Sequence, residues 1–231
     1  MPTYTVDRGE LESGLCTIVG QEAHHLARVL RAQEGEEIQL TDGHGHLFEG
    51  KIKTVGKEVL VSIIREILSP APFPVTLFVS FLKREKMEFI VEKSVELNLA
   101  GVTFLKTQHS VRTDISDLKR ERMDRIIQTA AKQCGRTHPF IIETVPIDEA
   151  MKKQMTHFIC VEKDVAPPFR KIFEKTPPPP YGIWIGPEGG WDKNEKEEMK
   201  TAGFHPITLG PLVLKAETAA VCAASSLLAQ L

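Results

Sequence analysis

The chain has 231 residues, of which 42% are hydrophobic and 26% are charged, a composition typical of a globular protein with a buried core. No apolar run reaches the roughly 20 residues that a membrane-spanning helix needs, and the N-terminal residues lack the basic start and apolar stretch of a secretory signal. With 29 Lys and Arg against 31 Asp and Glu, the near-neutral charge argues against a surface coated in nonspecific nucleic-acid contacts. We therefore expect a cytoplasmic protein without a membrane span, in which any RNA contact comes from local patches.

The cysteines and histidines do not have the spacing of a metal site. Two histidine pairs, His24 with His25 and His44 with His46, lack a carboxylate or thiol at a useful ligand spacing. We expect reduced, mostly buried thiols and no metal. The four cysteines lie far apart and contain no CxxC pair: Cys16, Cys134, Cys160 and Cys222.

Residues 3–68 show short apolar alternation interrupted by glycines, which predicts a small β-rich domain with tight turns. One helix is expected over residues 21–30, where Leu26, Val29 and Leu30 recur at helical spacing. Residues 69–74, SPAPFP, contain three prolines, which favour extended backbone and argue against both helix and central strand. We place the domain boundary there, with a first domain of residues 1–70 and a second of residues 71–231.

The second domain alternates apolar runs with amphipathic helical patterns, which predicts an α/β architecture with a mostly parallel sheet. Between the second and third strands lies the clearest helix, whose apolar residues recur at helical spacing from Met123 to Cys134, and Gly135 stands where it would end. Six strands are expected, at residues 75–82, 102–107, 140–145, 157–162, 182–186 and 206–209.

Another face of the helix that precedes Gly135 carries a basic strip. Its spacing by threes, fours and sevens would align the cations. A solvated face is the simpler interpretation on charge alone, with RNA binding as the alternative. The strip comprises Arg122, Arg125, Lys132 and Arg136.

The segment IGPEGGW, residues 185–191, follows an apolar strand and precedes a helix. Asp192 and Glu195 have the spacing of a capping box at the start of that helix. A glycine-rich turn at the carboxyl end of a strand lets backbone N–H groups approach a ligand, although a plain tight turn has the same composition. Neither GxGxxG nor GxxxxGK[ST] is present, so nothing favours a dinucleotide or a nucleoside triphosphate.

The last segment, LGPLVLKAETAAVCAASSLLAQL, combines a second strand-to-loop ending with a helix of unusually small residues. Ala219, Ala220, Ala223 and Ala224 would let this helix approach other backbone closely. An ordinary buried helix is one interpretation. The other is a helix packed under a ligand loop or against a second subunit.

IGPEGGW and LGPLVLKAETA together resemble the RsmE family of 16S rRNA uracil-N3 methyltransferases. Their order and spacing relative to HHLARVLR, GHG, EKSVELNLAGV and AAKQCGR extend the resemblance over nearly the whole chain. Two positions depart from the family's LGPRVLR. Leu212 lacks the charge of the first arginine, and Lys215 keeps a positive charge without the fork geometry of the second.

The resemblance implies a PUA-like β-barrel followed by a SPOUT-type α/β domain with a parallel sheet and a C-terminal trefoil knot. It also implies a homodimer paired through the knot, and S-adenosylmethionine bound by the knot loops. Knotted chains are rare, and nothing in the residue pattern alone predicts one. The residues expected to bind the cofactor are Val161, Ile185, Gly186, Pro187, Glu188, Gly189, Gly190, Leu209, Gly210, Leu214 and Thr218.

Methyl transfer from a sulfonium is a direct displacement that needs alignment and no metal. Uracil N3 is weakly acidic, so the reaction needs a base or a cation that stabilises the uracil anion. The catalytic candidates are Arg136, favoured as the anion stabiliser or RNA contact, and Glu188 and Glu217, which could instead hold their loops. The target base must be unpaired or flipped out. The candidate RNA contacts are His25, Arg28, Arg31, Lys83, Lys86, Arg136 and Lys215.

The leading hypothesis is therefore methylation of uridine N3 in 16S rRNA or the small ribosomal subunit. A SPOUT methyltransferase acting on another RNA is a near alternative, because Leu212 and Lys215 change the family pattern. A noncatalytic RNA-binding assembly factor is a second alternative. The intact IGPEGG and ETA loops argue against it, since a protein without cofactor has little need for both.

Overall fold

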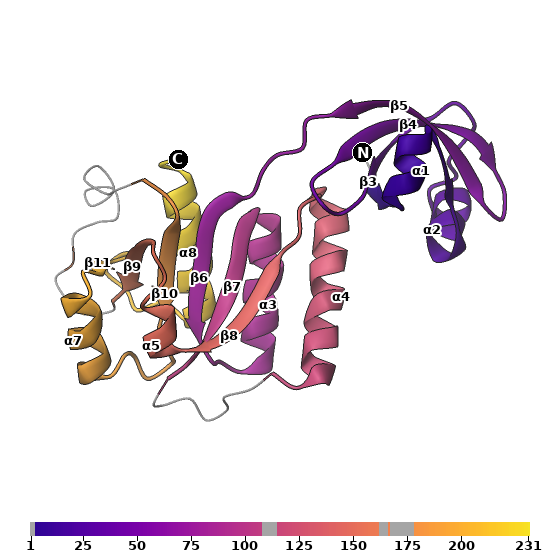
Figure 1. Cartoon of the computed structure of the whole chain (residues 1–231). Coiled ribbons are helices and arrows are strands. Elements are labelled where there is room, and N and C mark those ends of the chain that lie inside the picture. The colour runs from indigo at the N-terminus through magenta and orange to yellow at the C-terminus, as the bar shows by residue number, and fades with distance from the viewer. Residues whose placement is uncertain (1–2, 108–114, 162–165, 167–177) are drawn as a thin grey trace. The chain divides into compact units, whose positions relative to one another are not determined.

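In the computed structural model, which describes residues 3–107, 115–161, 166 and 178–231, the chain forms two compact units (Figure 1). Unit 1 comprises Met1–Ala71 and Thr129–Pro139, and unit 2 comprises Pro72–Gln128 and Phe140–Leu231. None of the helices in these described ranges is long and apolar enough to cross a membrane.

A curved five-stranded sheet makes up most of unit 1, in the order β1-β3-β4-β5-β2 (Figure 1). β1 is parallel to β3, and the other neighbours are antiparallel. Gly50 lies at an irregularity in the β4–β5 pairing, and a Cβ there would come within 2.6 Å of Val61 Cγ1. The predicted small β-rich domain is confirmed. Its strands are β1 (Thr3–Thr5), β2 (Leu15–Ile18), β3 (Glu37–Thr41), β4 (Leu47–Val55) and β5 (Val59–Ile67).

The helix predicted over residues 21–30 is only partly confirmed. After α1 (Arg8–Ser13), the chain forms α2 (Gly20–His24) and then a π-helical turn, η1 (His25–Val29), in which Leu30 N–H donates to His25 O at 3.0 Å. Because π-helical winding places more residues in each turn, Val29 and Leu30 no longer share a face with the buried Leu26. They are 61% and 47% exposed.

Unit 2 contains a six-stranded, entirely parallel sheet in the order β11-β9-β10-β6-β7-β8. Each of the six predicted strands overlaps one of these strands, with ends shifted by a few residues, so the parallel α/β fold is confirmed. The strands are β6 (Phe73–Ser80), β7 (Leu99–Lys106), β8 (Ile141–Pro146), β9 (Thr156–Cys160), β10 (Tyr181–Ile185) and β11 (His205–Ile207).

Helices cover both faces of this sheet (Figure 1). Leu77 of β6 and Ile183 of β10 pack with α3 and α8, whereas Phe78 and Trp184 point to the other face and pack with α5 and α7. This alternation explains the near-continuous apolar runs of the central strands. The helices of unit 2 are α3 (Arg84–Glu96), α5 (Ile147–Ala150), α7 (Lys193–Thr201) and α8 (Ala216–Leu228), together with the part of α4 (Asp117–Cys134) up to Gln128.

Two of the predicted helix ends are confirmed. Gly135, with φ of +77°, follows the last residue of α4, and its N–H donates to Ala131 O at 2.9 Å. At the start of α7, the carboxylate of Asp192 accepts from Asn194 N–H at 2.8 Å and that of Glu195 accepts from Asp192 N–H at 3.0 Å, which completes the capping box.

The structure corrects the expectation that prolines would keep residues 69–74 out of a central strand. β6 is central and begins at Phe73, so Pro74 lies inside it. The proline is tolerated because the β6–β7 register is irregular between Phe73 and Thr76, where a missing N–H removes no regular ladder bond.

The predicted basic strip is wrong for Arg136, because α4 ends before it. Its side chain is buried, and its guanidinium donates to the carbonyls of His138 and Pro139 at 2.9 Å each. Of the other cations, Arg122 pairs with Glu88 and Lys132 pairs with Glu22. Arg122, Arg125 and Lys132 are all exposed, so the interpretation as a solvated face agrees with the structure for these three cations.

Candidate functional site

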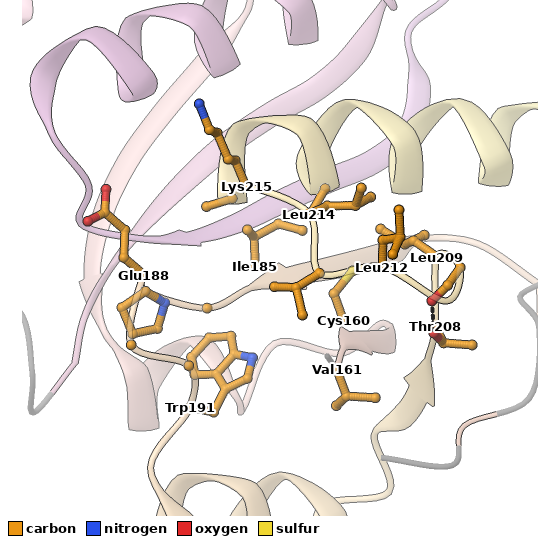
Figure 2. Close-up of a pocket in the computed structure, with 18 of the residues that line it drawn as sticks. Cys160, Val161, Ile185, Glu188, Trp191, Thr208, Leu209, Leu212, Leu214 and Lys215 are labelled. Carbon is orange, nitrogen blue, oxygen red and sulfur yellow. Dashed lines mark hydrogen bonds between the residues drawn. The ribbon is translucent and has the colours of Figure 1, made fainter. Parts of the chain in front are cut away.

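The described end of β9 and the loops after β10 and β11 meet at one edge of the unit 2 sheet, because these three strands are parallel and end there. They enclose a cavity of about 430 Å³ (Figure 2). Its walls come from the end of β9, the loop after β10, the loop after β11 and the first turn of α8. Ligands of open α/β sheets bind at this carboxyl edge of the strands.

The loop after β10 makes a tight turn around the cavity. Gly190 has a φ of +77°, which glycine adopts without steric cost, and its N–H donates to Pro187 O at 2.9 Å. At Gly186 an added Cβ would lie 3.0 Å from Nε1 of Trp191. Glycine at this position therefore lets the indole ring pack directly against the loop backbone.

The loop after β11 begins close to β9, since Val161 N–H donates to Ile207 O at 3.1 Å. Gly210 then takes a φ of +139°, and the Thr208 hydroxyl donates to its carbonyl at 3.3 Å (Figure 2). Leu212, which stands where the resembled family has an arginine, lines the cavity and is 78% exposed. This position therefore adds an apolar side chain to the wall of the cavity and no charge.

Lys86 of α3 joins the two ligand loops through ion pairs. Its Nζ lies 2.9 Å from Glu188 Oε1 and 3.2 Å from Glu217 Oε2. The hydrogen bond with Glu188 is the main cause that raises the pKa of Lys86, and the same bond lowers the pKa of Glu188. Lys86 and Glu188 therefore both stay charged across the neutral range.

Every expected cofactor residue except Thr218 lines the cavity. Thr218 and Glu217 instead line a neighbouring apolar groove, together with Phe89 and Val221. The loops of IGPEGGW and LGPLVLKAETA, although separated in sequence, are thus two walls of one cavity.

The expected RNA contacts are divided between the two units. Lys86 and Lys215 line the cavity, and Lys83 is exposed just before α3. In unit 1, Arg136 is buried, and burial lowers the pKa of its guanidinium. Three residues of unit 1 are exposed in the π-helical turn or just after it: His25, Arg28 and Arg31.

Several lining residues were missed by sequence reasoning. Trp191 directly follows IGPEGG and could have been found from the motif, whereas Lys196 and Ala219 face the cavity only because of how α7 and α8 pack. Cys160 also lines it, and burial raises the pKa of its thiol to about 12, so the thiol is not a nucleophile at neutral pH. In the ranges that the structure describes, no cluster of three or more His, Cys, Asp or Glu could hold a metal.

Comparison with protein families and known proteins gives a consistent result. The family model described as the RNA methyltransferase domain matches residues 69–228, more than half of the chain, and that of the RNA methyltransferase PUA domain matches residues 18–64. Among curated relatives, the Synechocystis protein named ribosomal RNA small subunit methyltransferase E is 28% identical over 211 residues, 88% of this chain and 69% of that protein.

Two solved structures are similar over almost their whole length. A ribosomal RNA small subunit methyltransferase E from Neisseria gonorrhoeae, bound to S-adenosyl methionine, has a TM-score of 0.83 and 27% identity, covering 100% of this chain and 98% of that one. A Legionella pneumophila protein in complex with the cofactor SAM has a TM-score of 0.74 and 30% identity, covering 94% and 92%.

Proposed function

Because this chain belongs to the family of the RNA methyltransferase domain, we propose that it transfers a methyl group from S-adenosylmethionine to N3 of a uridine in 16S rRNA. The observation that carries the proposal is the cavity at the ends of β9, β10 and β11, since all but one of the expected cofactor residues line it. Similar solved proteins have S-adenosylmethionine bound, and curated relatives are named for the small-subunit RNA.

The residues of the cavity suit this cofactor. Apolar side chains such as Val161, Ile185 and Leu214 offer a surface for its uncharged parts, and the glycine-rich loop after β10 brings backbone to the wall of the cavity, where a ligand's hydrogen-bonding parts can approach it closely. When bound, the cofactor supplies an electrophilic methyl group on a sulfonium. The protein's own task is then to hold the uracil nitrogen in line with that methyl group.

Deprotonation of uracil N3 needs a base or a cation. Because Lys86 lowers the pKa of Glu188 and pairs with Glu217, we propose that these carboxylates hold the loops in place and do not take the proton. Arg136 stays the proposed anion stabiliser or RNA contact, although its guanidinium donates to the carbonyls of His138 and Pro139 and is not among the residues that line the cavity. Arg136→Lys keeps the charge but loses the planar fork, so we expect a lower methylation rate and unchanged cofactor affinity.

We propose that the N-terminal domain, residues 1–70, is a PUA-like module that binds RNA. Residues 71–231 are then the catalytic SPOUT domain, with a trefoil knot in its C-terminal part. His25, Arg28 and Arg31 are exposed in the first domain and are available to phosphates. Their simultaneous replacement by alanine should weaken RNA binding and reduce its salt dependence. Because the proposed substrate is 16S rRNA, we propose that the protein acts in the cytoplasm.

We further propose a homodimer that forms along α8. The apolar groove beside this helix is lined by Phe89, which is 40% exposed, and by Val221, and a second copy would remove these side chains from water. Light scattering at micromolar concentration should give the dimer mass. A monomer would contradict this part of the proposal.

Calorimetric titration with S-adenosylmethionine and S-adenosylhomocysteine tests the cofactor site. Gly186→Trp should abolish binding, because Gly186 lines the cavity and an indole ring attached there would fill it, since the Cβ alone already lies 3.0 Å from Nε1 of Trp191. Gly56→Trp is the matched control, since Gly56 is exposed in unit 1 and a Cβ added there would have no neighbour closer than 3.7 Å. Failure of a folded wild-type protein to bind either compound favours the noncatalytic assembly factor.

Primer extension on RNA treated with the protein tests the target. Methylation of uracil N3 blocks the pairing edge, so reverse transcriptase should stop beside one uridine of 16S rRNA. A stop on a different RNA favours the alternative of another SPOUT substrate. Naked 16S rRNA and small subunits, compared in parallel, identify the preferred form of the substrate.

A further inference from the structure

Trp191 is a buried residue in the wall of the cavity. Only 8% of it is exposed, and it packs beside Trp184, with ring centroids 6.3 Å apart. The ring nitrogen lies against the backbone of Gly186, since a Cβ added to that glycine would be 3.0 Å from Nε1. Figure 2 shows the nitrogen edge of Trp191 turned toward the side of the cavity where Val161 and Cys160 lie.

The indole N–H of Trp191 has no hydrogen-bond partner among the residues that the structure describes. The chain has two tryptophans, and the other is satisfied, because Nε1 of Trp184 donates to Nδ1 of His157 at 2.9 Å. An indole nitrogen can only donate, and buried donors in native proteins nearly always have a partner. The unpaired donor of Trp191 therefore indicates an acceptor that the described residues do not provide.

We propose that the indole N–H of Trp191 donates a hydrogen bond to an oxygen or nitrogen acceptor of the bound S-adenosylmethionine. This inference rests on the proposed function and adds a binding residue to it. Trp191 takes part in recognition through its nitrogen, in addition to the packing of its ring against α7. The acceptor lies either on the nucleoside or on the amino-acid carboxylate of the cofactor.

Trp191→Phe tests the inference, because it removes the N–H and keeps an aromatic ring. We expect the Kd for S-adenosylhomocysteine to rise about two- to twelvefold, the range for losing one net hydrogen bond. The unfolding midpoint of the unliganded protein should fall less than in Trp184→Phe, because only Trp184 loses an internal hydrogen bond.

Nuclear magnetic resonance provides a readout that does not depend on activity. The indole region of a ¹H–¹⁵N spectrum should contain two signals, and Trp191→Phe assigns them by removing one. The Trp191 signal should move downfield when S-adenosylhomocysteine is added. If 5′-methylthioadenosine, which lacks the carboxylate, also moves it, the acceptor is on the nucleoside. If it does not, the acceptor is on the amino-acid part.

Unchanged affinity in Trp191→Phe together with a stationary Trp191 signal, while the wild-type protein binds S-adenosylhomocysteine, would overturn this inference and leave the proposed function intact. Absence of binding by the wild-type protein would overturn both. The two failures are therefore distinguishable in the same set of titrations.

Discussion

Replacing Lys86 with methionine tests whether its ion pairs hold the two cavity loops together. Oε2 of Glu217 is buried and has no hydrogen bond of good geometry to any described residue, so the ammonium of Lys86 at 3.2 Å is its charged partner. A buried polar atom left alone costs about 1–3 kcal/mol. Because the Glu217 side chain is still 19% exposed, we expect the free energy of unfolding to fall by about 1–2 kcal/mol at neutral pH.

The loss should depend on pH in a defined way. Lys86 lowers the pKa of Glu188 below its usual 4.5, so this stabilisation is present above pH 4.5 and disappears as the pH falls through the lowered value. The pKa of Lys86 is raised above 10.5, so the stabilisation disappears again only in strong alkali. The difference between wild type and Lys86→Met should therefore be largest between these limits and shrink in acid.

Urea unfolding at neutral and acidic pH measures this difference, and titration with S-adenosylhomocysteine should show weaker binding by the variant. Lys93→Met is the matched control on the same helix. Lys93 pairs with Glu92 at 2.7 Å and Glu96 at 2.8 Å, outside the cavity. Lys93→Met should therefore lower the free energy of unfolding much less than Lys86→Met, and cofactor affinity should not change. Equal losses in the two variants, or a Lys86→Met loss that persists in acid, would refute the reasoning.

Three further predictions concern the sheet beneath the cavity. Gly101→Ala should lower the free energy of unfolding by about 3 kcal/mol or more, because its Cβ would lie 2.4 Å from the carbonyl oxygen of Ile141 on the neighbouring strand; an unchanged urea midpoint contradicts this. Trp184→Phe should lower the free energy of unfolding by about 1–3 kcal/mol, because it leaves Nδ1 of His157 without its donor. A decrease no larger than that in Trp191→Phe would contradict this explanation. Burial lowers the pKa of His157, so the free energy of unfolding should decrease as the pH falls below about 6.5. In His157→Phe it should decrease less over the same pH range. An equal decrease in the two proteins would contradict a role of His157 in this pH dependence.

Local patterns in the sequence were sufficient for most elements of unit 2. Apolar runs marked the six strands, and helical periodicity with Gly135 marked the end of α4, because alternation and a 3.6-residue repeat are local properties. One error, the place of Arg136 in the basic strip, arose because α4 ends before that residue. Two others occurred where winding or register departs from the regular form. The π-helical turn at His25–Val29 rotated Val29 and Leu30 to the surface, and the irregular register of β6 accommodated Pro74.

The candidate site was predictable as two motifs. Each has glycines at the carboxyl end of a strand, which indicate a ligand loop, and the family resemblance supplied the cofactor. Lys86 illustrates the part that was not predictable. Its ion pairs with Glu188 and Glu217 join residues more than a hundred positions apart, and its expected RNA contact stays a prediction.

The sequence by itself determined the fold class of the second unit, the two loops that carry the ligand motifs and the family to which they point. The tertiary structure alone decided that these loops enclose one cavity, that Lys86 joins them, and that the N–H of Trp191 is buried there without a partner among the described residues. The physical reason is that backbone preference and burial pattern act over a few neighbouring residues. Ion pairing and satisfaction of a buried donor depend on atoms brought together from distant segments, which no local pattern encodes.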